Sequence, residues 1–346
     1  MTHTSSTVFA FCALVGIQVT VGIVYRLAGD GGYKFSPALS LMLSETIKLV
    51  IAIATLLYQR AHLPALFHSH MHLAPVAVGL ALLYAFNNLA AFQLFRMSDP
   101  ATISVSKSVA SIVVAAITYV IFGKKYAYPQ WICLALQVVG LSIIHLNVSS
   151  SLPSSSSSVS NNELVIPLLV IQVTISGSCG VWNSHTLKPK EVNLNAFNIF
   201  LYGFGALINS SAYFMYEGAS RSIFEGWSFA SAGILLCNSL IGLAISAIYK
   251  YSGAITRTWA TAIATCVLYF FVMVFKWATF PTVPIIQGIV IVFGCAYLYQ
   301  EFGKLSKVEK DSDATESTFS ARLLHVFLVC FALFCIFLFV RLKFTP

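Results

Sequence analysis

A lysine stands inside a long apolar stretch of this sequence, where a charge is costly and therefore points to a function. Lys107 lies within residues 100–122, and Ser104 and Ser111 fall on its helical face, three residues before it and four after it. Hydroxyl groups around a buried cation are typical of a watery cavity that attracts an anion. The alternative is that the long lysine side chain reaches the nearby boundary of the apolar layer.

An arginine holds a comparable position in the second half of the chain. Arg257 opens the apolar stretch 256–277, and Thr261 lies one turn further along on its face. The shift that superposes the two halves of the sequence places Thr261 opposite Lys107, so the two cations occupy nearly equivalent positions. Because arginine binds phosphate with a bidentate fork and lysine acts as a point charge, the pair would suit a diphosphate. An ordinary arginine at a membrane interface is the alternative.

Amide and carboxylate side chains also lie inside apolar stretches. Asn87 and Asn88 occupy the middle of one stretch, and Asn198 lies in another. Such amides either join neighbouring helices or contact a ligand. Glu45 and Lys48, three residues apart on one helical face, predict a structural ion pair, with proton coupling at Glu45 as the alternative.

The sequence contains few features typical of a metal site or of an enzyme. The eight cysteines lie in apolar stretches without a CxxC pair, so we expect buried thiols. HExxH, GxSxG and Walker motifs are absent, as is a basic tract interleaved with aromatics. We therefore expect no enzymatic activity, no cofactor, no metal and no nucleic acid partner. Four histidines form a loop cluster that we expect to be solvated rather than metal-binding: His62, His68, His70 and His72.

The elements that must position these residues are membrane-spanning helices. Hydrophobic residues make up 58% of the chain and charged residues only 9%, against about 25% charged residues in soluble domains. A spanning helix needs about 20 mostly apolar residues. The long, continuous apolar runs predict eleven spans, embedded in a lipid bilayer. They cover residues 8–28, 37–58, 74–95, 100–122, 128–147, 164–187, 194–216, 227–249, 256–277, 282–299 and 323–342.

The first ten spans read as two five-helix repeats. An odd number of spans in each repeat forces the second into the opposite orientation, as in many secondary transporters. Chance similarity between apolar helices is the alternative. The predicted parts are the first repeat (1–148), a Ser-rich lumenal linker (149–163), the second repeat (164–300), a cytosolic polar linker (301–322) and an additional transmembrane helix with a short tail (323–346).

Loop charges predict the orientation of these spans. With the N-terminus in the cytosol, cytosolic segments hold eleven Lys and Arg residues and the opposite segments hold seven. Positive residues favour the cytosolic side. We therefore expect a cytosolic N-terminus and a lumenal C-terminus.

Several motifs resemble those of nucleotide-sugar transporters of the UDP-galactose/CMP-sialic acid type. They follow the family's order and spacing over roughly residues 8–300. The matching stretches are Ser44-Glu45-Thr46-Ile47-Lys48-Leu49, Asn87-Asn88-Leu89 with Ser98-Asp99-Pro100-Ala101, Gln130-Trp131-Ile132 with Gly140, Ser176-Gly177-Ser178-Cys179-Gly180-Val181-Trp182, Asn198-Ile199, and Lys250-Tyr251 with Ile255 and Arg257.

The resemblance implies ten helices in the drug/metabolite transporter arrangement, to which the eleventh span is foreign. It also implies antiport of a nucleotide sugar, here expected to be a UDP-sugar of the UDP-galactose type, for a nucleoside monophosphate. The expected location is the Golgi or endoplasmic reticulum membrane, and the oligomeric state stays open, with a homodimer as one alternative. The expected substrate-binding residues are Asn87, Asn88, Ser104, Lys107, Ser111, Gly180, Trp182, Asn198, Arg257 and Thr261.

Four positions depart from the family pattern. Phe86 replaces a glutamine, Ser184 a glutamate and Phe197 an arginine, while Ala110 stands where the family has its fourth-helix lysine. These positions lie near the family's nucleotide site, so the base and sugar stay open. The alternatives are a transporter of the same fold for another metabolite and a membrane scaffold that does not transport.

Overall fold

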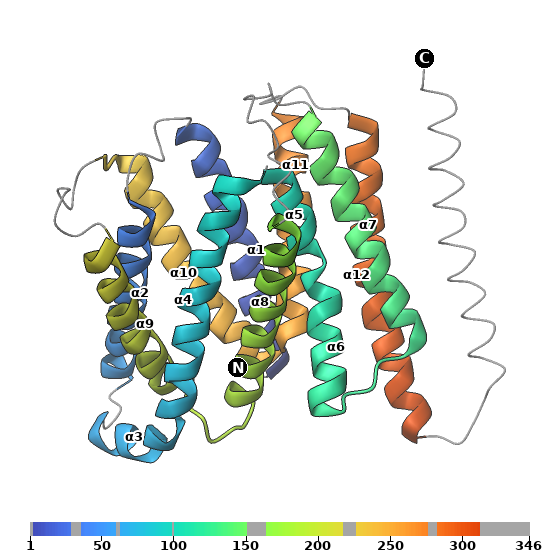
Figure 1. The fold of residues 1–346 in the computed structure, drawn as a ribbon. Coiled ribbons are helices and arrows are strands. Elements are labelled where there is room, and N and C mark those ends of the chain that lie inside the picture. The colour runs from blue at the N-terminus through green and yellow to red at the C-terminus, as the bar shows by residue number, and fades with distance from the viewer. Residues whose placement is uncertain are drawn as a thin grey trace. The chain divides into compact units, whose positions relative to one another are not determined.

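The computed structural model describes residues 3–28, 36–59, 63–98, 100–150, 164–216, 226–275 and 282–311. All regular structure in these ranges is helical (Figure 1). The elements are α1 (His3–Ala28), α2 (Pro37–Tyr58), α3 (Leu63–His70), η2 (Met71–Leu73), α4 (Ala74–Met97), α5 (Pro100–Ser108), α6 (Ala110–Phe122), α7 (Tyr128–Ser150), α8 (Val165–Leu187), α9 (Leu194–Tyr216), α10 (Phe229–Tyr251), α11 (Ala254–Val274) and α12 (Thr282–Asp311).

Among the described residues, nine helical segments are long and apolar enough to cross a membrane, which confirms an all-helical protein with many spans. They correspond to nine of the eleven predicted spans. The predicted span 194–216 is a helix, α9, but it is not among these nine segments. The predicted span 323–342 and most of the Ser-rich linker lie outside the described residues. Helix α12 continues past the predicted end of its span to Asp311.

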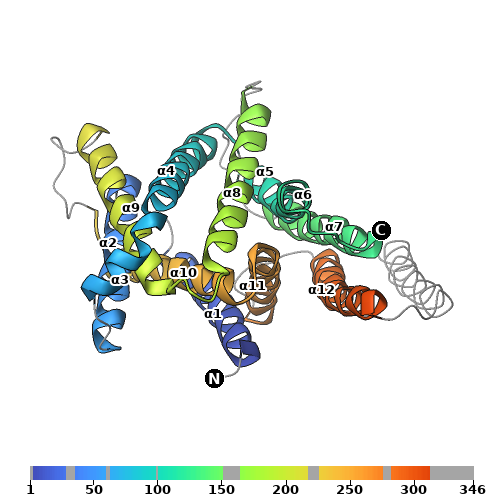
Figure 2. The same cartoon turned by 90° about the horizontal axis from the view of Figure 1, so that it is seen from below.

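The helices form two compact units, each built from both halves of the sequence. The first unit comprises residues 1–96 and 163–268, and in it α1 packs on α10 and α2 packs on α9. The second comprises residues 97–162 and 269–346, where α7 packs on α12. Figures 1 and 2 show α2 beside α9 and α7 beside α12. Each of these two pairs joins spans that hold the same position in the two predicted repeats. The inverted orientation of the repeats stays a prediction.

Small residues let α7 and α12 approach closely in the second unit. A Cβ atom at Gly288 would lie 2.7 Å from the carbonyl oxygen of Gly140 and 2.6 Å from Ile144 Cγ1. Membrane helices lack a hydrophobic drive toward each other and associate through such close backbone contact. The Gly140–Gly288 crossing therefore anchors the second unit.

The loop that was expected to be solvated instead folds into α3 and η2, and one of its histidines is buried. His70 is 6% exposed, and its Nε2 accepts a hydrogen bond of 3.0 Å from the backbone N–H of Asn193. Asn193 in turn caps α9, because its side-chain oxygen accepts from the N–H groups of Asn195 and Ala196. The expectation of a solvated loop is thus wrong for His70. No group of residues able to hold a metal occurs among the described residues.

Candidate functional site

One face of α10 carries the polar positions around which the first unit is organised. Ser239, Gly242, Ser246 and Tyr249 are spaced by three, four and three residues, which places them on a single helical stripe. Three of them are buried: Ser239 is 0% exposed, and Ser246 and Tyr249 are each 2% exposed. A polar stripe that faces protein rather than lipid is the expected location of a membrane protein's functional groups.

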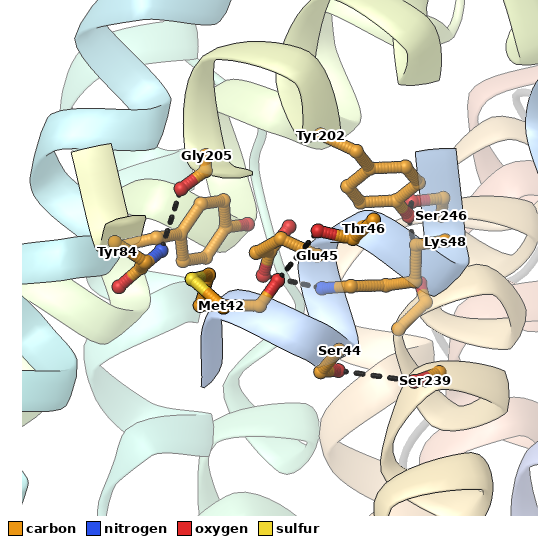
Figure 3. Close-up of polar contacts among 12 residues, drawn as sticks. Met42, Ser44, Glu45, Thr46, Lys48, Tyr84, Tyr202, Gly205, Ser239 and Ser246 are labelled. Atoms are coloured by element: carbon orange, nitrogen blue, oxygen red, sulfur yellow. Dashed lines mark hydrogen bonds and ion pairs between the residues drawn. The ribbon is translucent and has the colours of Figure 1, made fainter. Parts of the chain in front are cut away.

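An ion pair on α2 lies against the part of this stripe that contains Ser239 and Gly242 (Figure 3). Lys48 Nζ lies 2.5 Å from Glu45 Oε1 and 4.7 Å from the centre of the Tyr202 ring. A Cβ atom at Gly242 would lie 2.7 Å from Lys48 Cδ, and one at Gly205 would lie 3.0 Å from Glu45 Oε2. The two glycines therefore create the space that the ion pair occupies.

Hydroxyl groups tie the neighbouring helices to the same stripe (Figure 3). Ser239 Oγ donates to Ser44 Oγ at 3.2 Å, which links α10 to α2. The Tyr202 hydroxyl lies 2.8 Å from Ser246 Oγ and 3.2 Å from the carbonyl oxygen of Gly242, which links α9 to α10. The predicted Glu45–Lys48 pair thus belongs to a wider network that fixes three helices.

A second polar cluster surrounds Tyr249, the C-terminal residue of the stripe. Asn183 Nδ2 on α8 donates to the Tyr84 hydroxyl on α4 at 3.2 Å. The Tyr84 hydroxyl interacts with the neighbouring Tyr249 hydroxyl. A Cβ atom at Gly180 would lie 2.9 Å from the Tyr249 oxygen, so Gly180 makes room for that hydroxyl. Ligand contact at Gly180 stays a prediction, and the structure shows that Gly180 shapes the cluster by leaving room for Tyr249.

Arg257 on α11 supplies the positive charge of this second cluster. Its charge interacts electrostatically with both phenols, Tyr84 and Tyr249. Its Nε atom is buried without a hydrogen-bonding partner among the described residues. The hydroxyl of Thr261 donates to the Arg257 carbonyl oxygen and accepts from Gln18 Nε2, so its contacts hold α11 and α1.

Several buried amide oxygens in the first unit also lack a partner among the described residues. They belong to Asn87 on α4, Asn183 on α8 and Asn198 on α9. Asn183 is 2% exposed and Asn198 is 1% exposed. Because an unsatisfied buried acceptor is costly, these oxygens point to an absent hydrogen-bond donor. Asn88 is half-buried on α4, and Trp182 is 49% exposed on α8.

The predicted polar face around Lys107 lies in the second unit. One irregular turn at Val109, whose backbone stays right-handed helical, separates α5, which ends at Ser108, from α6, which begins at Ala110. Lys107 is exposed and Ser104 is half-buried, whereas Ser111 is 1% exposed and donates to the Ser108 carbonyl oxygen. Since Arg257 lies in the first unit, the predicted Lys107–Arg257 clamp stays a prediction.

Sequence reasoning missed the tyrosines and Asn183 of the second cluster. The available signal was the spacing of polar and small residues along α10, which marks one face of that helix. That spacing identifies the face but not its partners. The meeting of Tyr84, Asn183 and Tyr249 depends on how α4, α8 and α10 pack.

Comparison with known proteins identifies the family. Residues 5–300 match the family model described as "Nucleotide-sugar transporter". The chain is 30% identical over 320 residues to CMP-sialic acid transporter 4 of Oryza sativa subsp. indica, covering 88% of this chain and 77% of the relative. It is also 30% identical over 325 residues to CMP-sialic acid transporter 3 of Arabidopsis thaliana, covering 87% and 76%.

Two further matches support the fold and the family. The probable UDP-sugar transporter protein SLC35A4 of Xenopus tropicalis is 29% identical over 240 residues, covering 68% of this chain and 73% of the relative. A protein of known crystal structure superposes with a TM-score of 0.61 at 13% identity, covering 86% of this chain and 98% of that one. From the family match over most of its length, this chain belongs to the nucleotide-sugar transporter family and is a multi-pass membrane transporter rather than an enzyme.

Proposed function

We propose that this protein exchanges a nucleotide sugar, of the UDP-sugar type, for a nucleoside monophosphate across a Golgi or endoplasmic reticulum membrane. The observation that carries the proposal is Arg257 of the first unit, a half-buried residue whose Nε atom is itself buried. Arg257 has an unpartnered Nε, and no ion pair of Arg257 occurs among the described residues. A cation inside a membrane protein needs an anion, and the phosphate of a nucleotide supplies one.

The remaining groups divide between phosphate and the rest of the ligand. Arg257 would bind phosphate through its guanidinium fork. The contribution of Ser104, Lys107 and Ser111, which lie in the second unit, stays a prediction from the sequence. The unpartnered oxygens of Asn87 and Asn198 would accept from donor groups on the base or sugar. Asn88 and the exposed face of Trp182 would complete this part of the site. Gly180 and Thr261 would act indirectly, by placing Tyr249 and α11.

Exchange follows from the charge of the empty site. A vacant site that holds an unpaired arginine would have to carry that charge through the membrane during its return. Because an uncompensated charge is costly in a low-dielectric interior, reorientation would be favoured when an anion is bound. The protein would therefore return with a nucleoside monophosphate instead of empty.

The relatives suggest which nucleotides to test first. Their names specify CMP-sialic acid in two cases and a UDP-sugar in the third. Both ligand classes contain a pyrimidine nucleotide, so the shared chemistry is a pyrimidine base, a ribose and phosphate. The UDP-sugar assignment is the more specific part of the proposal and needs its own experimental arm.

Counterflow in proteoliposomes tests the proposal. Vesicles that contain the purified protein are loaded with UMP, with CMP or with buffer, and uptake of labelled UDP-galactose and CMP-sialic acid is measured. We expect UMP-loaded vesicles to take up UDP-galactose several times faster than buffer-loaded vesicles. Faster uptake of CMP-sialic acid into CMP-loaded vesicles would replace the UDP-sugar assignment. Equal uptake into loaded, empty and protein-free vesicles would contradict transport.

A further inference from the structure

We propose that the Tyr249 hydroxyl, held by Tyr84 and Asn183, is a second donor to the phosphate that Arg257 binds. This proposal rests on the proposed function and deepens it, because it names a residue that distinguishes a phosphorylated ligand from a nucleoside. Four observations in the first unit carry it: the phenol pair, the glycine beneath it, the unpartnered amide and the adjacent arginine.

Counting protons shows that the phenol pair has a donor to spare. Each of the Tyr84 and Tyr249 hydroxyls carries one proton. The Tyr84 oxygen accepts the N–H of Asn183, so the Tyr84 proton can point toward the neighbouring Tyr249 oxygen. With Tyr84 as the donor in this pair, the Tyr249 proton stays available to an acceptor beside Arg257.

The position of the Tyr249 oxygen is fixed by α8. A Cβ atom at Gly180 would lie 2.9 Å from this oxygen, so any larger residue there would displace it. One turn further along α8, Ser184 Oγ donates to the Tyr249 carbonyl oxygen at 3.4 Å. Tyr249 is only 2% exposed. A hydroxyl held this firmly loses little freedom when it binds a ligand, which favours its use in recognition.

Asn183 provides independent support for a ligand at this place. Its Nδ2 donates to Tyr84, whereas its Oδ1 has no partner among the described residues, although the residue is 2% exposed. The cluster thus offers a positive charge, a spare hydroxyl donor and an unsatisfied acceptor. A phosphate ester that also carries a hydroxyl or N–H group would satisfy all three, and a nucleotide has both kinds of group.

The test compares phosphorylated and unphosphorylated ligands. Tyr249→Phe removes the hydroxyl and keeps the ring, and affinity for UMP, CMP, uridine and cytidine is measured by calorimetry on purified protein. Tyr213→Phe is the matched control, because Tyr213 is 3% exposed in the same unit and packs against Phe214. We expect Tyr249→Phe to weaken monophosphate binding by about tenfold, as for loss of a charge-assisted hydrogen bond. Nucleoside binding and the control should change by less than about twofold.

Three outcomes would count against the proposal. Unchanged monophosphate affinity in folded Tyr249→Phe would overturn it while leaving the proposed function intact. Equal losses for nucleosides and monophosphates would show that Tyr249 does not contact phosphate. Absence of nucleotide binding and exchange in the wild-type protein would refute the proposed function and this inference with it.

A substitution at Gly180 tests the same oxygen from the opposite side. Gly180→Ala should displace the Tyr249 hydroxyl and weaken monophosphate binding by a similar factor, whereas Gly79→Ala should not, because a Cβ at Gly79 meets nothing within 4 Å. In a Tyr249→Phe background the clashing oxygen is gone, so Gly180→Ala should add little. Fully additive losses in the double variant would contradict the proposed role of Gly180.

Discussion

The two polar clusters of the first unit differ in whether their cation has a carboxylate partner. Lys48 has its carboxylate partner on the same helix, with Glu45 Oε1 2.5 Å away and the Tyr202 ring above it. Arg257 has two neutral phenols nearby, and its Nε has no partner among the described residues. The first cluster therefore contains its own counter-charge, whereas the second is where we propose that an anion binds.

The difference predicts that the first cluster contributes mainly to the stability of the fold and the second mainly to ligand binding. A buried ion pair becomes costly when one partner is removed, because the other charge is left alone. Arg257 is half-buried and its Nε has no partner among the described residues, so we expect its removal to cost little stability. The same kind of substitution is thus expected to have opposite effects at the two ends of the α10 stripe.

The largest loss of stability should follow removal of the Glu45 carboxylate. Glu45→Gln leaves Lys48 without its counter-charge, and the free energy of unfolding should fall by about 3–5 kcal/mol. Thermal unfolding in detergent gives the measurement. Glu45→Gln combined with Lys48→Met removes both charges and should recover most of the loss. A double variant less stable than the single variant would show that the pair is not self-contained.

A smaller loss should come from filling the space that the ion pair occupies. A Cβ at Gly242 would lie 2.7 Å from Lys48 Cδ, so Gly242→Ala should cost about 1–3 kcal/mol of unfolding free energy. Gly79→Ala, with open space around it, should instead stabilise α4 by about 0.4–1 kcal/mol. Denaturation midpoints of the two variants provide the check. Equal shifts of the same sign would mean that the close contact at Gly242 carries no energetic weight.

The smallest effect on stability should be that of Arg257→Ala. Because Arg257 has no ion pair among the described residues, the unfolding free energy should stay within about 1 kcal/mol of wild type or rise. Added nucleoside monophosphate should raise the unfolding temperature of the wild type and not that of the variant, since binding to the folded state is stabilising. A strongly destabilised Arg257→Ala would indicate a structural partner for this arginine.

The fold class and most helices could be predicted from the sequence because apolar runs of spanning length are a strong signal. The ion pair was predictable as well, since Glu45 and Lys48 lie three residues apart on one face. The irregular turn at Val109 was not, because the residues around it lack a proline or a glycine that would disturb a helix. The burial of His70 escaped prediction because it depends on Asn193, far away in the sequence.

The candidate site was only half predictable for a related reason. Arg257 and the asparagines are conspicuous because charged and amide groups are rare in spanning helices. Tyrosines are common there, and the roles of Tyr84 and Tyr249 depend on the packing of α4, α8 and α10. The roles of Gly205 and Gly242 also depend on helix packing, because these glycines leave room for side chains from another helix.

The most direct test of the account is the affinity of Arg257 variants for nucleoside monophosphates. Calorimetry on purified wild type, Arg257→Ala and Arg257→Lys should show a loss of about ten- to a hundredfold for alanine. Lysine should recover part of it, because the charge survives while the bidentate fork does not. Affinity for the nucleosides should change little. Wild-type affinity for UMP and CMP in a folded Arg257→Ala would contradict the claim that this arginine binds the phosphate.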